Sequence, residues 1–197
     1  MNYLAHAWLS FNQPEILVGN MISDFVKGKK RFSFSENIQQ GIMLHRSIDE
    51  FTDAHDATKK AKQFLKPDVG LYAGAFIDIA YDHFLANDSN EFNNDDSLLN
   101  FSLSVYKTLN NHEASLPERF ARILPYMEND NWLFNYKTLY GTEQSFKGLV
   151  RRAKYLENNS AVFEAFQKNY ELLQLCYESF FPDVKNFAFR KFSDLNI

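Results

Sequence analysis

The chain has 197 residues, of which 45% are hydrophobic and 23% charged, and its formal net charge is −4. This length is sufficient to bury a substantial core, and we expect a single domain over residues 1–197. The slightly negative charge argues against a nucleic-acid-binding protein that relies on overall positive charge. The single cysteine, Cys176, excludes an intramolecular disulfide and a thiolate metal cluster, which favours a cytoplasmic protein.

No segment of the sequence is expected to enter a membrane. The opening residues MNYLAHAWLS lack a basic leader and place His6 where a signal peptide would have its apolar core. The most apolar later segment is interrupted by Asp78 and Asp82, and it falls short of the roughly 20 apolar residues that cross a bilayer. We therefore expect neither export nor a membrane partner.

Apolar residues recur at spacings of three and four along most of the chain, and only 7 glycines and 5 prolines interrupt them. This periodicity predicts an all-α fold, a compact bundle of several helices. Ser35 is typical of an N-cap and predicts a long helix that runs to about Asp53. The other helices are expected, in chain order, over about 2–9, 15–28, 68–88, 97–110, 117–128, 132–140, 144–156 and 160–181.

A polar stripe runs along the long helix that follows Ser35. His45, Asp49 and Asp53 occur at steps of four among apolar residues such as Ile48, so the three polar side chains share one face. An imidazole and a carboxylate one turn apart can hold a divalent cation. The same pair also fits a salt-bridged helix face, so the stripe alone leaves both interpretations open.

Asp78 and Asp82 form a second pair one turn apart, on a helix that is apolar almost all round. Carboxylates are rarely buried unless they are paired or bind a metal. Two like charges in a buried site would raise at least one pKa, and a cation would stabilise both groups as anions. The alternative is a cationic side chain that reaches in from a neighbouring helix, with Arg46 as the available residue.

His6 and Asp24 also lie among apolar residues, in NYLAHAW and GNMISDFVKG. Imidazole and carboxylate groups that converge from separate helices match the ligand preferences of Mn²⁺, Mg²⁺ or Fe better than those of a thiolate zinc site. His83 follows Asp82 directly and points about 100° away from it around the helix. This direction favours a supporting or proton-donating role for His83 over direct metal contact.

Two basic segments provide candidate contacts for an anion. The segment KGKKR concentrates four positive charges in five residues. Those side chains are Lys27, Lys29, Lys30 and Arg31. The segment is either a solvated loop or a docking surface for an acidic partner or a phosphate. Arg151 and Arg152 form a second candidate phosphate clamp, because guanidinium groups pair with phosphate oxygens in a bidentate manner.

Four motifs in succession carry a resemblance to a known family. NYLAHAWLS, GNMISDFVKG, GIMLHRSIDEFTDAH and IAYDHFLA resemble, in order and spacing, the motifs of acyl carrier protein phosphodiesterases, divergent relatives of the HD-domain metal phosphohydrolases. The resemblance extends more weakly through NWLFNY, GLVRRAKYL and FFPDV to the rest of the chain. It implies an all-helical fold and a divalent metal, typically manganese, with magnesium or iron as alternatives. It also implies removal of 4′-phosphopantetheine from the serine of holo-acyl carrier protein.

The resemblance also implies roles for individual residues. The metal ligands that it implies are His6, Asp24, His45, Asp49 and Asp82. The pattern departs from an ordinary HD domain because His45 is followed by Arg46, and because the acid and the histidine at positions 82 and 83 stand in reversed order. The resemblance therefore does not determine which of these residues contact the metal directly.

The hypothesis for the reaction is attack of a metal-activated hydroxide on the diester phosphorus. Arg46 and Arg152 would neutralise charge on the phosphoryl oxygens, and Asp78 or His83 would give a proton to the leaving serine oxygen. Two alternatives remain at this point. One is a metal phosphohydrolase that acts on a nucleotide or another small phosphodiester, and the other is a non-catalytic helical module that binds an acidic carrier through KGKKR.

Overall fold

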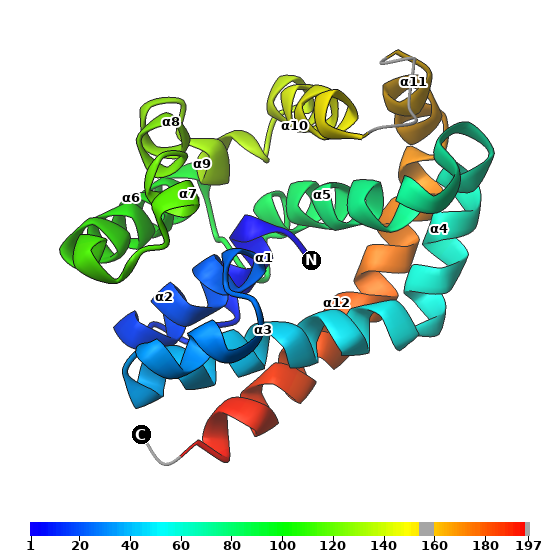
Figure 1. Cartoon of the computed structure of the whole chain (residues 1–197). Coiled ribbons are helices and arrows are strands. Elements are labelled where there is room, and N and C mark those ends of the chain that lie inside the picture. Colours follow the sequence, from blue (N-terminus) through cyan, green and yellow to red (C-terminus); the bar gives the residue numbers. More distant parts are fainter. Residues whose placement is uncertain (154–159, 196–197) are drawn as a thin grey trace.

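A computed structural model describes residues 1–153 and 160–195, and every regular element within them is a helix, as the sequence predicts (Figure 1). The α-helices are α1 (Tyr3–Trp8), α2 (Pro14–Ile22), α3 (Glu36–Ala54), α4 (Asp56–Val69), α5 (Ala73–Ala86), α6 (Asp95–Asn111), α7 (Glu118–Ala121), α8 (Leu124–Asn129), α9 (Trp132–Asn135), α10 (Leu139–Arg152), α11 (Ser160–Lys168) and α12 (Tyr170–Ser193). The short 3-10 helices are η1 (Ser23–Phe25), η2 (Gly28–Ser33), η3 (Gly70–Tyr72) and η4 (Glu113–Ser115). Among the described residues, no helix combines the length and apolarity that a bilayer crossing requires.

The ends of several helices differ from the sequence prediction for local reasons. The segment expected as one helix over 68–88 is divided, because Gly70 adopts a positive φ of 56° and ends α4, after which α5 begins at Ala73. The segment 160–181 is divided at Asn169, and α12 then continues past its internal Pro182. The helix α4 was not predicted. Residues 154–156 of the helix expected over 144–156 lie outside the described residues.

The tightest helix crossing in the site region joins α2 and α3. Two glycines face each other there, and a Cβ added to Gly19 would lie 2.1 Å from the carbonyl oxygen of Ile38. A Cβ on Gly41 would lie 2.3 Å from the carbonyl oxygen of Ile16. Only glycine allows two backbones to approach so closely. The crossing therefore brings the end of α2 against the middle of α3, where His45 is located.

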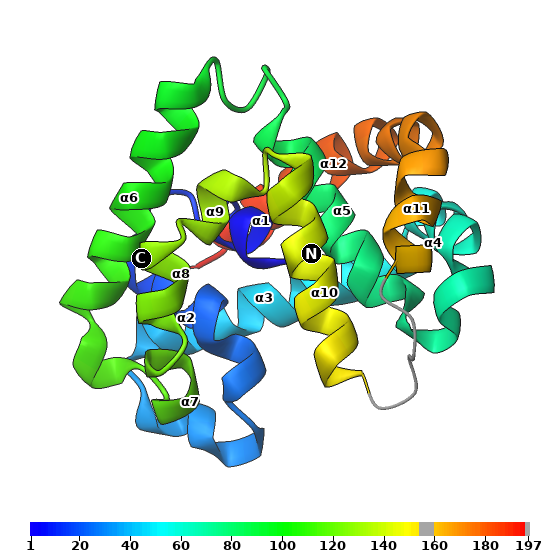
Figure 2. The same cartoon turned by 90° about the horizontal axis from the view of Figure 1, so that it is seen from above.

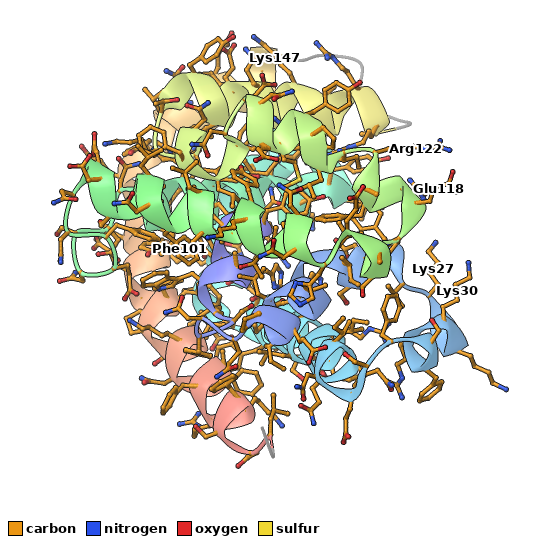
Figure 3. All side chains as sticks on the ribbon, turned by 90° about the vertical axis from the view of Figure 1, so that its left-hand side faces the viewer. Lys27, Lys30, Phe101, Glu118, Arg122 and Lys147 are labelled. Atoms are coloured by element: carbon orange, nitrogen blue, oxygen red, sulfur yellow. The ribbon has the colours of Figure 1, made fainter. Side chains whose placement is uncertain are left out.

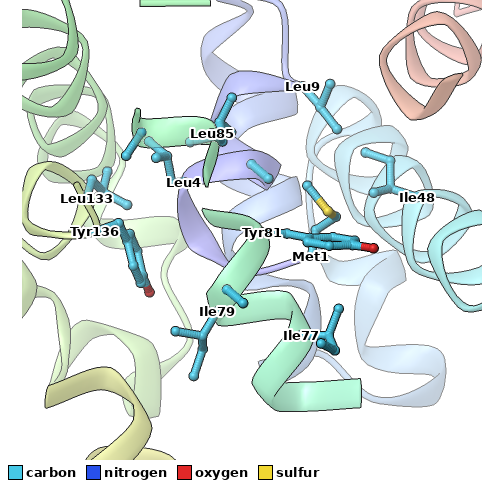
Figure 4. Packing of buried hydrophobic residues seen from close by; sticks show 14 of the residues in the cluster. Met1, Leu4, Leu9, Ile48, Ile77, Ile79, Tyr81, Leu85, Leu133 and Tyr136 are labelled. Carbon is cyan, nitrogen blue, oxygen red and sulfur yellow. The ribbon is translucent and has the colours of Figure 1, made fainter. Parts of the chain in front are cut away.

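Helix α1 packs against α2 and α5 and lies at the centre of the view in Figure 2. Figure 4 shows the apolar side chains around this contact, including Leu4 from α1 with Ile79 and Tyr81 from α5. All three are at most 4% exposed. Burial of this much apolar surface fixes α1, which carries His6, relative to α5.

His83 lies on the side of α5 that faces α10 and α12, and it is buried. Its Nδ1 donates to the carbonyl oxygen of Tyr136 at 2.7 Å, and its Nε2 lies 2.8 Å from the hydroxyl of Tyr170, which donates to it. Both ring nitrogens therefore have partners, an arrangement that the neutral imidazole satisfies. Burial lowers the pKa of His83, against a smaller opposing effect of the hydrogen bond to Tyr136.

We predict that Gly19→Ala destabilises the protein by about 1–3 kcal/mol, because the added methyl group must push α2 away from α3. Gly148→Ala in α10 is the matched control. A Cβ on Gly148 meets nothing within 4 Å, and alanine is the better helix former, so this variant should be as stable as the parent or more stable by up to about 1 kcal/mol. Urea denaturation gives both values. Equal stability of the two variants would contradict the close crossing.

We predict that protonation of His83 makes folding pH-dependent. Because the folded chain binds this proton less readily than the unfolded chain, the free energy of unfolding should decrease as the pH falls below the ordinary histidine pKa of about 6.5. His83→Gln should be less stable than the parent at pH 7.5 but should lose less stability on acidification to pH 5.5. Urea denaturation at the two pH values measures this, and parallel losses in both proteins would exclude His83 as the source.

Candidate functional site

Three of the sequence-predicted ligands meet at one point, His6 from α1 with His45 and Asp49 from α3. Nε2 of His6 lies 3.1 Å from Oδ1 of Asp49, and Nε2 of His45 lies 3.1 Å from Oδ2 of the same carboxylate. The two imidazole rings are stacked, with their centroids 3.8 Å apart. The ligand atoms of the three residues all lie within 4.8 Å of one another, and no other such group occurs in the part of the chain that the structure describes. We call this set the His–His–Asp group.

Asn20 orients both imidazoles and was missed by the sequence analysis. Nδ1 of His6 donates to Oδ1 of Asn20 at 2.8 Å, and Nδ1 of His45 donates to the Asn20 carbonyl oxygen at 2.7 Å. The fully buried Asn20 amide in turn donates to the His6 carbonyl oxygen and to Ser10 Oγ. Both Nε2 atoms are thereby directed at Asp49. A lone asparagine in the apolar run of α2, four residues before Asp24, was the available signal.

Asp24, in η1, approaches His45 from a second direction. Its Oδ1 lies 3.3 Å from Nε2 of His45, and its side chain is 77% exposed. Burial alone would lower the pKa of His45, but the neighbouring carboxylates of Asp24 and Asp49 raise it to about 9. Burial and then the charge of His45 lower the pKa of His6 to about 4. The two carboxylates thus create a negative potential at His45 that also favours a divalent cation.

The donor set fits a divalent metal ion. Nε2 of His45 is buried and has no partner in hydrogen-bonding geometry among the described residues, although two carboxylates are close. An ion bound there would displace the proton of this nitrogen and use its lone pair. Two imidazole nitrogens with carboxylate oxygens can bind a divalent metal ion. Histidine ligands commonly donate the N–H of their other ring nitrogen to a fixed oxygen, as both do here to Asn20.

Asp78 lies beside the His–His–Asp group and is linked to it through the amino group of Met1. That nitrogen is 2.9 Å from Oδ1 of Asp78 and 3.6 Å from Oδ1 of Asp49. Burial raises the pKa of the Asp78 carboxyl, against the opposing effect of the Met1 amino group. A carboxyl group with a raised pKa at the edge of a metal site is suited to donate a proton.

Asp82 and His83 are not brought into the group. The Asp82 carboxylate lies beneath the start of α1 and accepts the N–H groups of Asn2, Leu4 and Ala5 at 3.3, 2.7 and 3.2 Å. These bonds satisfy N–H groups that a helix start leaves free, which explains why this carboxylate is buried without a cation. Burial raises the pKa of Asp82 to about 7 although the N–H groups lower it. Asp82 thus lies outside the His–His–Asp group and holds the start of α1, and metal ligation by Asp82 stays a prediction.

A cleft of about 1080 Å³ opens next to Asp24 and contains both predicted arginines of α10, Arg151 and Arg152. Arg119 of α7 lines the same cleft and was missed, because a single arginine in a short helix carries no sequence signal. Burial and then the charge of Asp24 raise the pKa of Tyr3 to about 12, while Arg152 lowers it. Tyr3, Asp24 and Arg152 are therefore close enough to influence one another.

Arg46 does not line this cleft. Its Nη2 donates to the carbonyl oxygen of Val26 at 3.0 Å, so it ties α3 to the segment between η1 and η2. Neither does it pair with Asp78 or Asp82, the alternative that the sequence left open, since those carboxylates have the partners described above.

The basic segment, Lys27, Lys29, Lys30 and Arg31, lies on η2 and its N-cap residue. Its three lysines are exposed, and Figure 3 shows Lys27 and Lys30 at the same edge of the molecule as Glu118 and Arg122 of the α7 region. The Arg31 guanidinium stacks over the ring of Phe32, 4.7 Å from its centroid. The positive charge is thus presented to solvent on the side of the molecule where α7 also contributes Arg119 to the cleft.

Comparison with known proteins gives the family. The family model described as acyl carrier protein phosphodiesterase matches residues 1–184. The chain is 29% identical to the acyl carrier protein phosphodiesterase of Yersinia enterocolitica over 188 residues, 95% of this chain and 97% of the relative. It is 26% identical to that of an Escherichia coli strain (CFT073) over 191 residues, 97% and 99% of the two chains. No solved structure matches the chain. This agreement over nearly the whole length shows that the chain belongs to the acyl carrier protein phosphodiesterase family.

Proposed function

We propose that this protein hydrolyses the phosphodiester that joins 4′-phosphopantetheine to a serine of holo-acyl carrier protein. Water adds to the phosphorus, the bond from phosphorus to the serine oxygen breaks, and the products are the apo carrier and 4′-phosphopantetheine. The observation that carries the proposal is the His–His–Asp group, which lies beside Asp24 and an arginine-lined cleft in a chain of this family. We place the reaction in the cytoplasm, since the one cysteine of the chain is free.

We propose that His6, His45 and Asp49 hold one divalent ion, manganese by preference and magnesium or iron as alternatives, with Asp24 beside it. Such an ion, when bound, supplies Lewis-acid activation of water and of the phosphoryl group. Asn20 accepts the hydrogens of both Nδ1 atoms, so each Nε2 is the ring nitrogen that would give up its proton to bind the ion. Asp82 acts at a distance, since it anchors the helix that carries His6.

We assign the proton transfer and the charge neutralisation to separate side chains. Asp78 gives a proton to the leaving serine oxygen, a role that His83 cannot share because both of its ring nitrogens have partners elsewhere. Arg152, close to Asp24, neutralises charge that develops on the phosphoryl oxygens. Arg46 acts as a positioning residue through its bond to the Val26 carbonyl oxygen.

We propose that the basic segment docks the carrier protein. The exposed charges of Lys27, Lys29 and Lys30, with the half-buried Arg31, suit an acidic partner despite the negative total charge, because local potential steers association. Arg151 adds positive charge at the cleft that receives the substrate.

The reaction predicts a manganese-dependent change in carrier mass. Incubation of holo-acyl carrier protein with the purified protein and manganese should convert it to the apo form, and a chelator should prevent the conversion. Mass spectrometry of the intact carrier measures both. If the carrier stays in the holo form while a nucleotide diester is cleaved, the substrate is the small diester of the first alternative. Carrier binding that survives chelation, without cleavage of any diester, would support the non-catalytic module.

We predict that substitutions in the His–His–Asp group, or at Asn20 beside it, reduce manganese binding while the protein still folds. Asp49→Asn removes a charged ligand and should abolish stoichiometric manganese binding. Asn20→Ala should weaken manganese affinity by about 10–100-fold, because both imidazoles lose their orienting acceptor. His112→Ala changes a histidine outside the group, at the end of α6, and should bind manganese like the parent.

Elemental analysis of the dialysed proteins gives the stoichiometry, and titration with manganese gives the affinity. Full manganese occupancy in Asp49→Asn, with the parent equally loaded, would remove Asp49 from the ligand set.

A further inference from the structure

The cleft beside Asp24 has more capacity than a phosphate alone requires. Its volume of about 1080 Å³ lies just above the roughly 300–1,000 Å³ typical of sites for drug-sized ligands. One wall comes from the start of the chain and from η1, and the other comes from α7 to α10. A second cavity, of about 640 Å³, lies on the other side of Phe25 and is lined by Glu15 and Glu118 with a single lysine, so it suits an anion less well.

Three kinds of side chain line the cleft. Charged groups are the first kind, with the guanidinium groups of Arg119, Arg151 and Arg152 and the carboxylates of Asp24 and Asp130. Carboxamide groups supply a second kind, from Asn129, Asn135 and Gln144. Aromatic side chains supply a third kind, from Tyr3, Trp132 and Tyr140. Such a mixture suits a long ligand with an anionic end, amide bonds and apolar carbons.

A phosphopantetheine arm has this composition, with a phosphate, two amide bonds, a hydroxyl group and a branched apolar segment. Arginine pairs with phosphate oxygens, and side-chain carboxamides can donate to and accept from amide bonds. Aromatic rings cover apolar carbons at low entropic cost. The kinds of contact available in the cleft therefore match the kinds of chemical group in the arm.

We infer that this cleft receives the phosphopantetheine arm of the carrier, with the phosphate toward Asp24 and Arg152 and the amide bonds along the carboxamide side chains of α8 to α10. The inference rests on the proposed function, since it assigns a place for the arm of that substrate. It makes Gln144 and Tyr140, both exposed on α10, binding residues for the arm.

Gly148 offers a direct test because it lines the cleft and an added Cβ there meets nothing within 4 Å. Gly148→Trp places a large side chain in the space assigned to the arm without displacing backbone. Lys147→Trp is the matched control, since it adds the same side chain at the next position of α10, where Lys147 pairs with Glu143 and does not line the cleft.

The measurements are kcat and KM with holo-acyl carrier protein and inhibition by added 4′-phosphopantetheine. Gly148→Trp should raise KM and the inhibition constant by about tenfold or more, with manganese content equal to that of the parent. Lys147→Trp should keep both constants within about twofold of the parent. Gln144→Ala, an exposed helix position that tolerates alanine, should raise KM by about threefold, and it keeps the inference testable if Gly148→Trp fails to fold.

An unchanged KM and inhibition constant in folded Gly148→Trp would overturn the assignment of the cleft while leaving the proposed function intact. If Gly148→Trp does not fold, an unchanged KM in Gln144→Ala has the same consequence. Failure of the parent protein to release phosphopantetheine would instead overturn the proposed function, and the inference with it.

Discussion

The candidate site depends on one buried residue, Asn20, which holds two histidines from different helices. Its side chain accepts a hydrogen bond from His6 of α1, and its backbone carbonyl accepts one from His45 of α3. The contact with His45 requires α2 to lie almost backbone to backbone on α3, which Gly19 and Gly41 permit. A looser crossing would separate Asn20 from His45, and the two imidazoles would no longer both direct Nε2 at Asp49. The close packing at Gly19 and Gly41 therefore sets the geometry of the candidate metal centre.

Charge in this region is balanced locally, and each of three carboxylates, of which only Asp82 is fully buried, has a different partner. Asp49 lies between two imidazoles, Asp78 pairs with the amino group of Met1, and Asp82 accepts three backbone N–H groups. Asp78 and Asp82, one turn apart on α5, thus have different roles. Asp78 faces the group, whereas Asp82 and His83 support the helices around it. Buried polar groups need partners, and the available partner decides the role of each group.

Asp24 connects two parts of the site that are chemically distinct. On one side it lies 3.3 Å from His45, and on the other it lines the cleft with Arg151 and Arg152. A phosphodiester with its phosphorus near Asp24 would have the candidate metal ligands on one side and room for a long substituent on the other. The exposed lysines of the basic segment do not line this cleft.

Local sequence by itself determined the helical class, the capping of α3 by Ser35 and the placement of His45 and Asp49 on one face, because each depends on contacts within a few residues. It also singled out His6 and Asp24 as polar residues in apolar surroundings. Only the tertiary structure decided that Asn20 orients both imidazoles, that Asp82 caps α1 and that Arg119 joins the cleft. Helical periodicity assigns a residue to a face, but the group opposite that face comes from a distant part of the chain, and the packing of helices selects it.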